Sequence, residues 1–148
     1  MRILCVASSG GHLALLMSLV ADWPADVQWV TFDTPDARSR LRGQDVIWAH
    51  HPTQRNPLNA ARNLLLARRV MAADPPDAVV SNGAGVAVPF LLWARWREVT
   101  TVFVEVPDRI QHPSLTGRLV AQWVDAVVLS APEQAAFYED GVFFGRLS

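Results

Sequence analysis

Short apolar runs alternate with longer helical segments along the chain, and this alternation constrains the fold more than any other feature. Runs rich in β-branched and aromatic residues predict six strands, at residues 3–7, 27–32, 46–49, 78–81, 100–106 and 126–129. Helices are expected between and after them, at residues 12–21, 35–41, 57–73, 86–97, 116–123 and 132–138. The strands lack polar alternation, as is typical of a sheet covered on both faces. The sequence therefore predicts an α/β fold, a Rossmann-like, doubly wound, mostly parallel six-stranded sheet in one domain over residues 1–148.

Composition excludes several classes of function. The 148 residues carry a formal net charge of −1, so no general basic field marks a nucleic-acid-binding protein. The 13 basic residues are all arginine, which excludes a phosphate-loop lysine and a Schiff-base lysine. Cys5 is the single cysteine, so an internal disulfide and a cysteine-rich zinc site are excluded. It lies in an apolar run, where packing is its expected role. We expect neither a metal nor a cofactor.

The apolar stretches are too short to predict a signal peptide or a membrane span. The first apolar run ends at the glycines of residues 10 and 11, and the longest uncharged stretch, residues 84–94, contains Pro89. A spanning helix needs about 20 apolar residues. We therefore expect a cytoplasmic protein that can still lie on a membrane surface.

Two glycine loops follow predicted strands and precede predicted helices, at residues 8–12 and 82–85. Glycine lets the backbone turn sharply, and the free N–H groups of a helix N-terminus suit a phosphate or diphosphate. The first and fourth strands are neighbours in the usual doubly wound order, so we expect the two loops to face one anionic ligand. A tight turn without a ligand is the simpler alternative. A dinucleotide-binding site is a weaker alternative, because the spacing of the glycines does not fit the dinucleotide-binding motif. In its favour, Asp33 stands at the end of a strand, where a ribose-binding acid would stand.

His12 and Glu105 are the candidate acid–base residues. His12 stands at a helix start, where the partial positive charge disfavours imidazolium, and a neutral imidazole can accept a proton from a hydroxyl. A histidine that only caps or packs the helix is an equal alternative. Glu105 ends an apolar strand at the binding edge of the sheet, which favours a site role over an ion pair with Arg109.

The helix expected at residues 57–73 has an unusual surface. Residues 46–73 contain four arginines and no acidic residue. The helical period places Ala60, Leu64, Ala67 and Met71 toward the sheet. The next helix also combines tryptophan with arginine, a pairing favoured at membrane interfaces. We predict a membrane-facing side formed by Leu58, Arg62, Leu65, Leu66, Arg69, Trp93 and Trp96. A protein–protein contact is the alternative.

Several motifs together resemble a known family. The segment Ser-Ser-Gly-Gly-His-Leu at residues 8–13 resembles the opening of the PssD-type bacterial polysaccharide-synthesis proteins. It is also similar to the membrane-anchoring subunit of the eukaryotic two-subunit UDP-N-acetylglucosamine transferase of dolichol-linked oligosaccharide synthesis. More distantly it is similar to the N-terminal domain of MurG. Residues 31–38, 49–53, 83–89 and 113–118 look like further segments of the same family.

The resemblance implies the N-terminal, acceptor-binding half of a GT-B glycosyltransferase. A separate donor-binding subunit would supply the UDP-sugar site in a heterodimer, and the acceptor would be a polyprenyl-diphosphate-linked sugar at the cytoplasmic face of the membrane. His12 and Glu105 would serve the sugar hydroxyl. The acceptor and its diphosphate would meet Ser9, Gly10, Gly11, Asn82, Gly83, Ala84, Gly85, Ser114 and Thr116.

The chain departs from the family pattern in two places. The membrane helix of the eukaryotic subunit has no counterpart here, so attachment would be peripheral, and Val-Pro-Asp follows Glu105 where the family often has serine or an aromatic residue. The alternatives are a non-catalytic membrane scaffold that recruits the catalytic subunit, and a nucleotide-binding Rossmann module.

Overall fold

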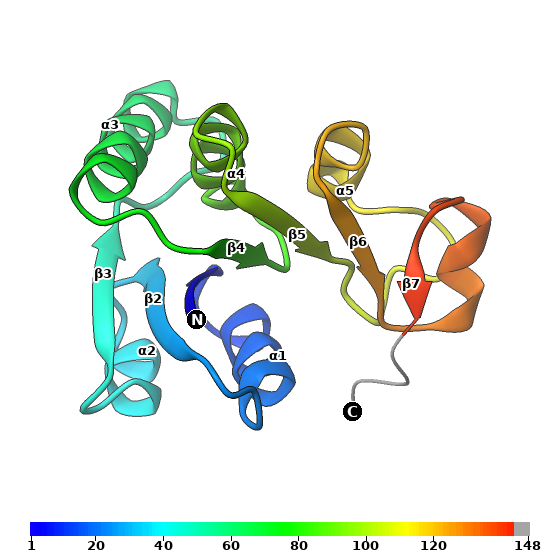
Figure 1. The fold of residues 1–148 in the computed structure, drawn as a ribbon, viewed down its shortest axis with the longest axis horizontal. Coiled ribbons are helices and arrows are strands. Elements are labelled where there is room, and N and C mark those ends of the chain that lie inside the picture. Colours follow the sequence, from blue (N-terminus) through cyan, green and yellow to red (C-terminus); the bar gives the residue numbers. More distant parts are fainter. Residues whose placement is uncertain (144–148) are drawn as a thin grey trace.

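The computed structural model describes residues 1–143, which form one parallel seven-stranded sheet with helices on both faces (Figure 1). The strands are β1 (Arg2–Val6), β2 (Asp26–Phe32), β3 (Asp45–Ala49), β4 (Ala78–Ser81), β5 (Thr100–Val104), β6 (Ala126–Leu129) and β7 (Val142–Phe143). Their order across the sheet is β3-β2-β1-β4-β5-β6-β7. The strand order reverses between β1 and β4, which is where doubly wound sheets bind ligands. The predicted doubly wound α/β fold is confirmed.

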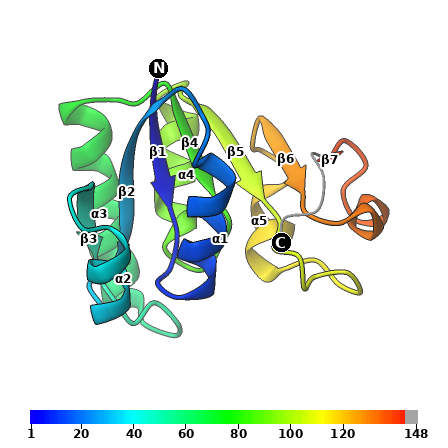
Figure 2. The same ribbon diagram turned by 90° about the horizontal axis from the view of Figure 1, so that it is seen from below.

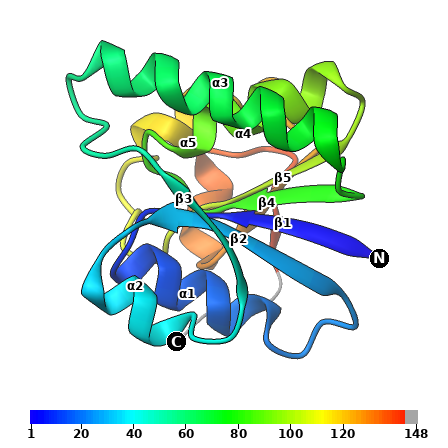
Figure 3. The same cartoon turned by 90° about the vertical axis from the view of Figure 1, so that its left-hand side faces the viewer.

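Two helical layers enclose the sheet (Figure 3). The helices within residues 1–143 are α1 (Gly11–Val20), α2 (Pro35–Arg40), α3 (Pro57–Ala73), α4 (Ala87–Trp96), α5 (Leu115–Val120) and the 3-10 helix η1 (Pro132–Ala136). α3, α4 and α5 lie on one face, and α1 and α2 lie on the other. The arrowheads of β1, β5 and β6 point to the same edge of the sheet (Figure 2), so the loops that follow the strands gather there.

The strands are apolar on both sides because both sides are core. In β1, Leu4 and Val6 pack in the cluster under α3 and α4, whereas Ile3 and Cys5 pack in the cluster against α1. Cys5 is fully buried, as expected for a packing role, and burial raises the pKa of its thiol to about 12.

Several elements differ from the sequence-based expectation, and α5 ends at Val120 rather than residue 123. β5 ends at Val104 rather than residue 106, because the Val106 N–H donates to the Glu105 carboxylate at 3.1 Å and leaves the ladder. The last helix is the short η1 rather than a helix over residues 132–138. The sheet gains a seventh strand, β7, whose two residues are too few to give a periodic signal.

The buried side of α3 is also different from the one expected. Asn59, Asn63, Ala67 and Met71 are its buried residues, whereas Leu64 is 41% exposed. Asparagines can be buried here because their amide groups bond to the loop before the helix. The predicted inward position of Ala60 and Leu64 was therefore wrong by about one residue on the helical wheel.

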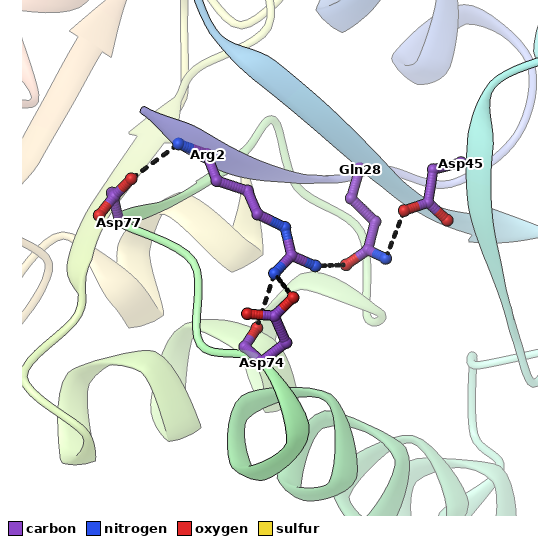
Figure 4. A network of polar contacts seen from close by, with 5 residues as sticks. All are labelled: Arg2, Gln28, Asp45, Asp74 and Asp77. Carbon is purple, nitrogen blue, oxygen red and sulfur yellow. Dashed lines mark hydrogen bonds and ion pairs between the residues drawn. The ribbon is translucent and has the colours of Figure 1, made fainter.

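A polar network closes the amino edge of the sheet, opposite the ligand-binding edge (Figure 4). The Arg2 guanidinium contacts Asp74 at the end of α3 and donates to Gln28 at 3.1 Å. Gln28 donates to Asp45 at 2.8 Å, and the Arg2 N–H donates to Asp77 at 2.7 Å. These contacts join the first residue of β1 to β2, β3 and the α3–β4 connection, so they fix the register at the far edge of the sheet.

Candidate functional site

The two glycine loops lie beside each other at the carboxyl edge of β1 and β4. His12 Nδ1 lies 3.1 Å from the Asn82 carbonyl oxygen, and the Asn82 amide group donates to the His12 carbonyl at 2.6 Å. Strands β1 and β4 are directly paired below these contacts. The expected apposition of the loops is therefore confirmed, and a reciprocal pair of side-chain hydrogen bonds joins them.

This contact fixes which nitrogen of His12 carries its hydrogen. A carbonyl oxygen only accepts, so Nδ1–H must donate to Asn82. In the neutral ring Nε2 then carries the free lone pair, and no residue among those described bonds to it. His12 is half-buried, and its ring packs about 3.8 Å from the position that a side chain at Gly83 would take. In this tautomer Nε2 is therefore the ring atom that can accept a proton.

The backbone of both loops needs unusual conformations. Gly10 has φ of +80°, Gly83 has φ of +110°, and Ala84 has φ of +68°. Gly10 caps α1 without a side-chain hydrogen bond, and the first turn of α1 has no acidic residue. The first N–H groups of this ten-residue helix therefore point out of its end without an internal partner.

Gly10→Ala is expected to destabilise the fold by roughly 1–2 kcal/mol, the cost of placing an L-residue in the left-handed region. Gly11→Ala is the matched control, because Gly11 lies in the helix with open space around it. It should be neutral or stabilising by up to about 1 kcal/mol. Urea unfolding of both variants measures the difference, and equal stability of the two would contradict the assigned conformation of Gly10.

Asn82 presents a second unusual feature of the same junction. Its side chain is 1% exposed, and its Oδ1 has no hydrogen-bond partner among the described residues. A buried amide oxygen without a donor costs about 1–3 kcal/mol. The junction between the glycine loops thus holds a buried acceptor that no donor of the described residues satisfies.

Glu105 is placed differently from His12, because it is fully buried. Its Oε2 accepts from the Ser114 N–H at 3.0 Å, from the Ser114 hydroxyl at 3.1 Å and from the Tyr138 hydroxyl. Burial and the hydrogen bond to Glu105 raise the pKa of Tyr138 above its usual range, so Tyr138 stays a donor. The partners of Glu105 are therefore Ser114 and Tyr138 rather than Arg109, and the geometry favours a structural anchor over direct contact with a substrate.

The remaining predicted ligand contacts differ in exposure. Ser114 is half-buried and caps α5 by accepting from the Gly117 N–H at 2.9 Å, so its hydroxyl is already engaged. Among the others, Gly11 and Gly85 are exposed, Ser9, Gly10, Ala84 and Thr116 are half-buried, and Gly83 is buried. Within residues 1–143, no group of three or more histidine, cysteine, aspartate or glutamate side chains could hold a metal ion.

The predicted membrane-facing residues are mostly exposed. Leu58 is 60% exposed, Leu65 is 53% exposed and Trp96 is 71% exposed, and Arg62 and Arg69 are exposed beside them. Leu66 and Trp93 are half-buried and pack against the core, so they are less exposed than the rest of this predicted face. The sequence predicts a helix here but not its part in this face: α5 adds exposed Leu115 and Leu119 on the same face of the sheet as α3 and α4. No helix of the described residues is long and apolar enough to cross a bilayer.

A family model described as "Oligosaccharide biosynthesis protein Alg14 like" matches residues 34–147. The chain belongs to this Alg14-like family. The matched segment contains the second glycine loop, Glu105 and all of α3 to α5. The resemblance drawn from the sequence motifs is confirmed.

The relatives of the Alg14-like chain are glycosyltransferases. A protein of Eremothecium gossypii named UDP-N-acetylglucosamine transferase subunit ALG14 is 32% identical over 119 residues, which cover 76% of this chain and 53% of that protein. A Roseiflexus protein named UDP-N-acetylglucosamine--N-acetylmuramyl-(pentapeptide) pyrophosphoryl-undecaprenol N-acetylglucosamine transferase is 36% identical over 165 residues, covering 87% of this chain and 37% of that protein. The chain thus spans about half or less of the length of these relatives.

Solved structures agree on the fold. MurG of Acinetobacter baumannii matches with a TM-score of 0.77 and 17% identity, covering 98% of this chain and 45% of that one. A UDP-GlcNAc 2-epimerase from Neisseria meningitidis matches with a TM-score of 0.75 and 12% identity, covering 99% of this chain and 46% of that one. At these identities the likeness shows that the Alg14-like chain has a Rossmann-like fold of the GT-B type.

Proposed function

We propose that this chain is the acceptor-binding part of a glycosyltransferase that moves a sugar from a UDP-sugar to a polyprenyl-diphosphate-linked sugar. The observation that carries the proposal is the junction of the two glycine loops, joined by His12 and Asn82 at the switch point of the sheet. The names of the relatives support the reaction class.

The acceptor diphosphate would lie against the start of α1. The N–H groups there have no internal partner, and neither a capping side chain nor an acidic residue competes with an anion. Gly10 and Gly11 leave open space where a side chain would stand, so phosphoryl oxygens can approach the backbone closely. Residues 82–85 would close the other side of the ligand.

His12 would act as the general base. Its Nε2 would take the proton from the attacking hydroxyl of the acceptor sugar. The hydroxyl oxygen would then bond to the anomeric carbon of the donor sugar while that carbon's bond to the UDP oxygen breaks, and UDP would leave with the electron pair. Orientation of the ring by the Asn82 carbonyl serves this step, since the base must point one defined nitrogen at the substrate.

Glu105 would act as a positioning residue. Its carboxylate holds Ser114 at the start of α5 and Tyr138 after η1, so it fixes the loop over residues 107–113 at the binding edge. A proton-transfer role would require the loss of these hydrogen bonds during the reaction.

The donor site would belong to a partner subunit in a heterodimer. This chain covers 45% of MurG of Acinetobacter baumannii, so more than half of that single chain has no counterpart here.

The test is reconstitution with a radiolabelled UDP-sugar and a farnesyl-diphosphate-linked N-acetylglucosamine. Transfer should need both the chain and its donor-binding subunit. Transfer by the purified chain alone would contradict the division of the active site.

The layer of α3, α4 and α5 would rest on the cytoplasmic face of the membrane. These three helices contain five arginines and no acidic residue. Exposed leucines and Trp96 lie among the arginines, a combination that suits the headgroup region of an anionic bilayer. Peripheral contact of this kind would bring the site to a lipid-linked acceptor.

Replacing both Arg62 and Arg69 with glutamine is expected to weaken binding to anionic phospholipid vesicles roughly 30-fold, because each lost charge costs about 1 kcal/mol of binding free energy. The matched control replaces Arg40, the last residue of α2 in the opposite layer, and Arg42, which follows that helix, and should leave vesicle binding unchanged. Vesicle co-sedimentation at low salt measures both. Equal losses in the two double variants would show that net charge, rather than this face, governs binding.

A further inference from the structure

The loop between β3 and α3, residues 50–56, is held in place by two buried asparagines of α3. Asn63 accepts from the His50 N–H at 2.8 Å and donates to the His50 carbonyl at 2.9 Å. Asn59 donates to the Pro52 carbonyl at 2.9 Å. Asn63 is 1% exposed and Asn59 is 6% exposed, so these bonds are shielded from water. A loop fixed at both His50 and Pro52 presents the next residue, Thr53, in a defined position.

Thr53 lies directly against the second glycine loop. A side-chain carbon built at Gly85 would stand 3.0 Å from Thr53 Oγ1 and 3.1 Å from Thr53 Cβ. The loop from β3 and the loop from β4 therefore touch at Gly85, and the absence of a side chain there is what lets the hydroxyl approach. Thr53 is half-buried and Gly85 is exposed, so the contact lies at the rim of the candidate site rather than in the core. No described residue bonds to the Thr53 hydroxyl, which leaves it free to donate.

We propose that residues 50–56 form a third wall of the acceptor site, in which the Thr53 hydroxyl donates a hydrogen bond to the diphosphate held at residues 83–85. Asn63 is the positioning residue, because it fixes the loop that carries Thr53 without itself reaching the ligand. This inference rests on the proposed function, since it needs the diphosphate to lie on the second glycine loop. A hydroxyl beside backbone N–H groups matches phosphoryl oxygens, which only accept.

The test measures binding of a farnesyl-diphosphate-linked N-acetylglucosamine to the purified full chain by calorimetry. Thr53→Val keeps the volume against Gly85 and removes the hydroxyl, and Thr53→Ser keeps the hydroxyl. Thr53→Val should weaken binding roughly 10-fold or more, as expected for a lost hydrogen bond to a charged group, and Thr53→Ser should remain within a few-fold of the parent protein. Unchanged affinity in Thr53→Val, or equal losses in both variants, would overturn the role of the hydroxyl.

The positioning role of Asn63 is tested by a double-mutant cycle in the same assay. Asn63→Ala should weaken binding in the parent protein and have little further effect in Thr53→Val, since both changes remove the same contact. A loss of thermal stability with unchanged affinity would mean that Asn63 only supports the fold, which overturns this part. If the parent chain itself fails to bind the probe, the proposed function fails first. If it binds and Thr53→Val binds equally well, only the third wall fails.

Discussion

Gly117→Ala is expected to lower the free energy of unfolding by roughly 3 kcal/mol, because it overpacks a buried polar cluster and disrupts its hydrogen bonds. A side-chain carbon at this position would overlap the Tyr138 hydroxyl oxygen and would lie 2.7 Å from Glu105 Oε2 and 2.9 Å from Ser114 Oγ. None of these atoms can move freely, because the Ser114 and Tyr138 hydroxyl groups both donate hydrogen bonds to Glu105 Oε2. Urea or thermal unfolding measures the effect.

A second variant separates overpacking from other effects of alanine. Tyr138→Phe alone removes one donor from Glu105 and should cost about 1 kcal/mol. When Tyr138→Phe is combined with Gly117→Ala, it also removes the hydroxyl oxygen that the alanine side chain would overlap. The double variant should therefore be more stable than Gly117→Ala by itself. A double variant whose two losses simply add would contradict the steric explanation.

His12→Ala is expected to lower kcat of the reconstituted complex by about 100-fold to 10,000-fold, the usual contribution of a positioned general base. The loss follows from the free Nε2 that the Asn82 carbonyl orients. His112→Ala is the matched control, because His112 is exposed and has no part in the proposed chemistry. It should retain full activity.

The same variant separates the enzyme from a scaffold. If the chain only recruits a catalytic subunit to the membrane, His12→Ala should assemble with that subunit and remain fully active. Size-exclusion chromatography of the mixed subunits shows whether assembly is intact, so a loss of kcat can be assigned to chemistry. Full activity of the assembled His12→Ala complex would favour the scaffold.

Most of the sheet could be predicted from the sequence because its signals are local. Runs such as residues 3–7 are apolar on both sides, and both sides are core in the structure. The two glycine loops could also be anticipated, since glycine before a helix and the usual strand order together place them at one edge. The hydrogen bonds between His12 and Asn82 that join the loops could not be predicted, because the two residues are 70 positions apart in the chain.

The environment of Glu105 could not be predicted, since its partner Tyr138 lies 33 residues away and no periodic pattern connects them. Position at the end of β5 suggested a site role, yet the carboxylate turns inward to anchor α5. The buried face of α3 was misassigned for a similar reason. Asn59 and Asn63 are polar, so a hydrophobic pattern places them outward, whereas the loop at residues 50–52 supplies the partners that allow their burial.

The most direct test of the central claim is a comparison of two ligands on the purified chain. Calorimetry would measure the affinity for a farnesyl-diphosphate-linked N-acetylglucosamine and for UDP-N-acetylglucosamine under the same conditions. An acceptor-binding chain should bind the lipid-linked sugar, lose that binding when Gly10 is replaced by alanine, and show no saturable binding of the nucleotide sugar. Saturable binding of UDP-N-acetylglucosamine without binding of the lipid-linked sugar would contradict the account.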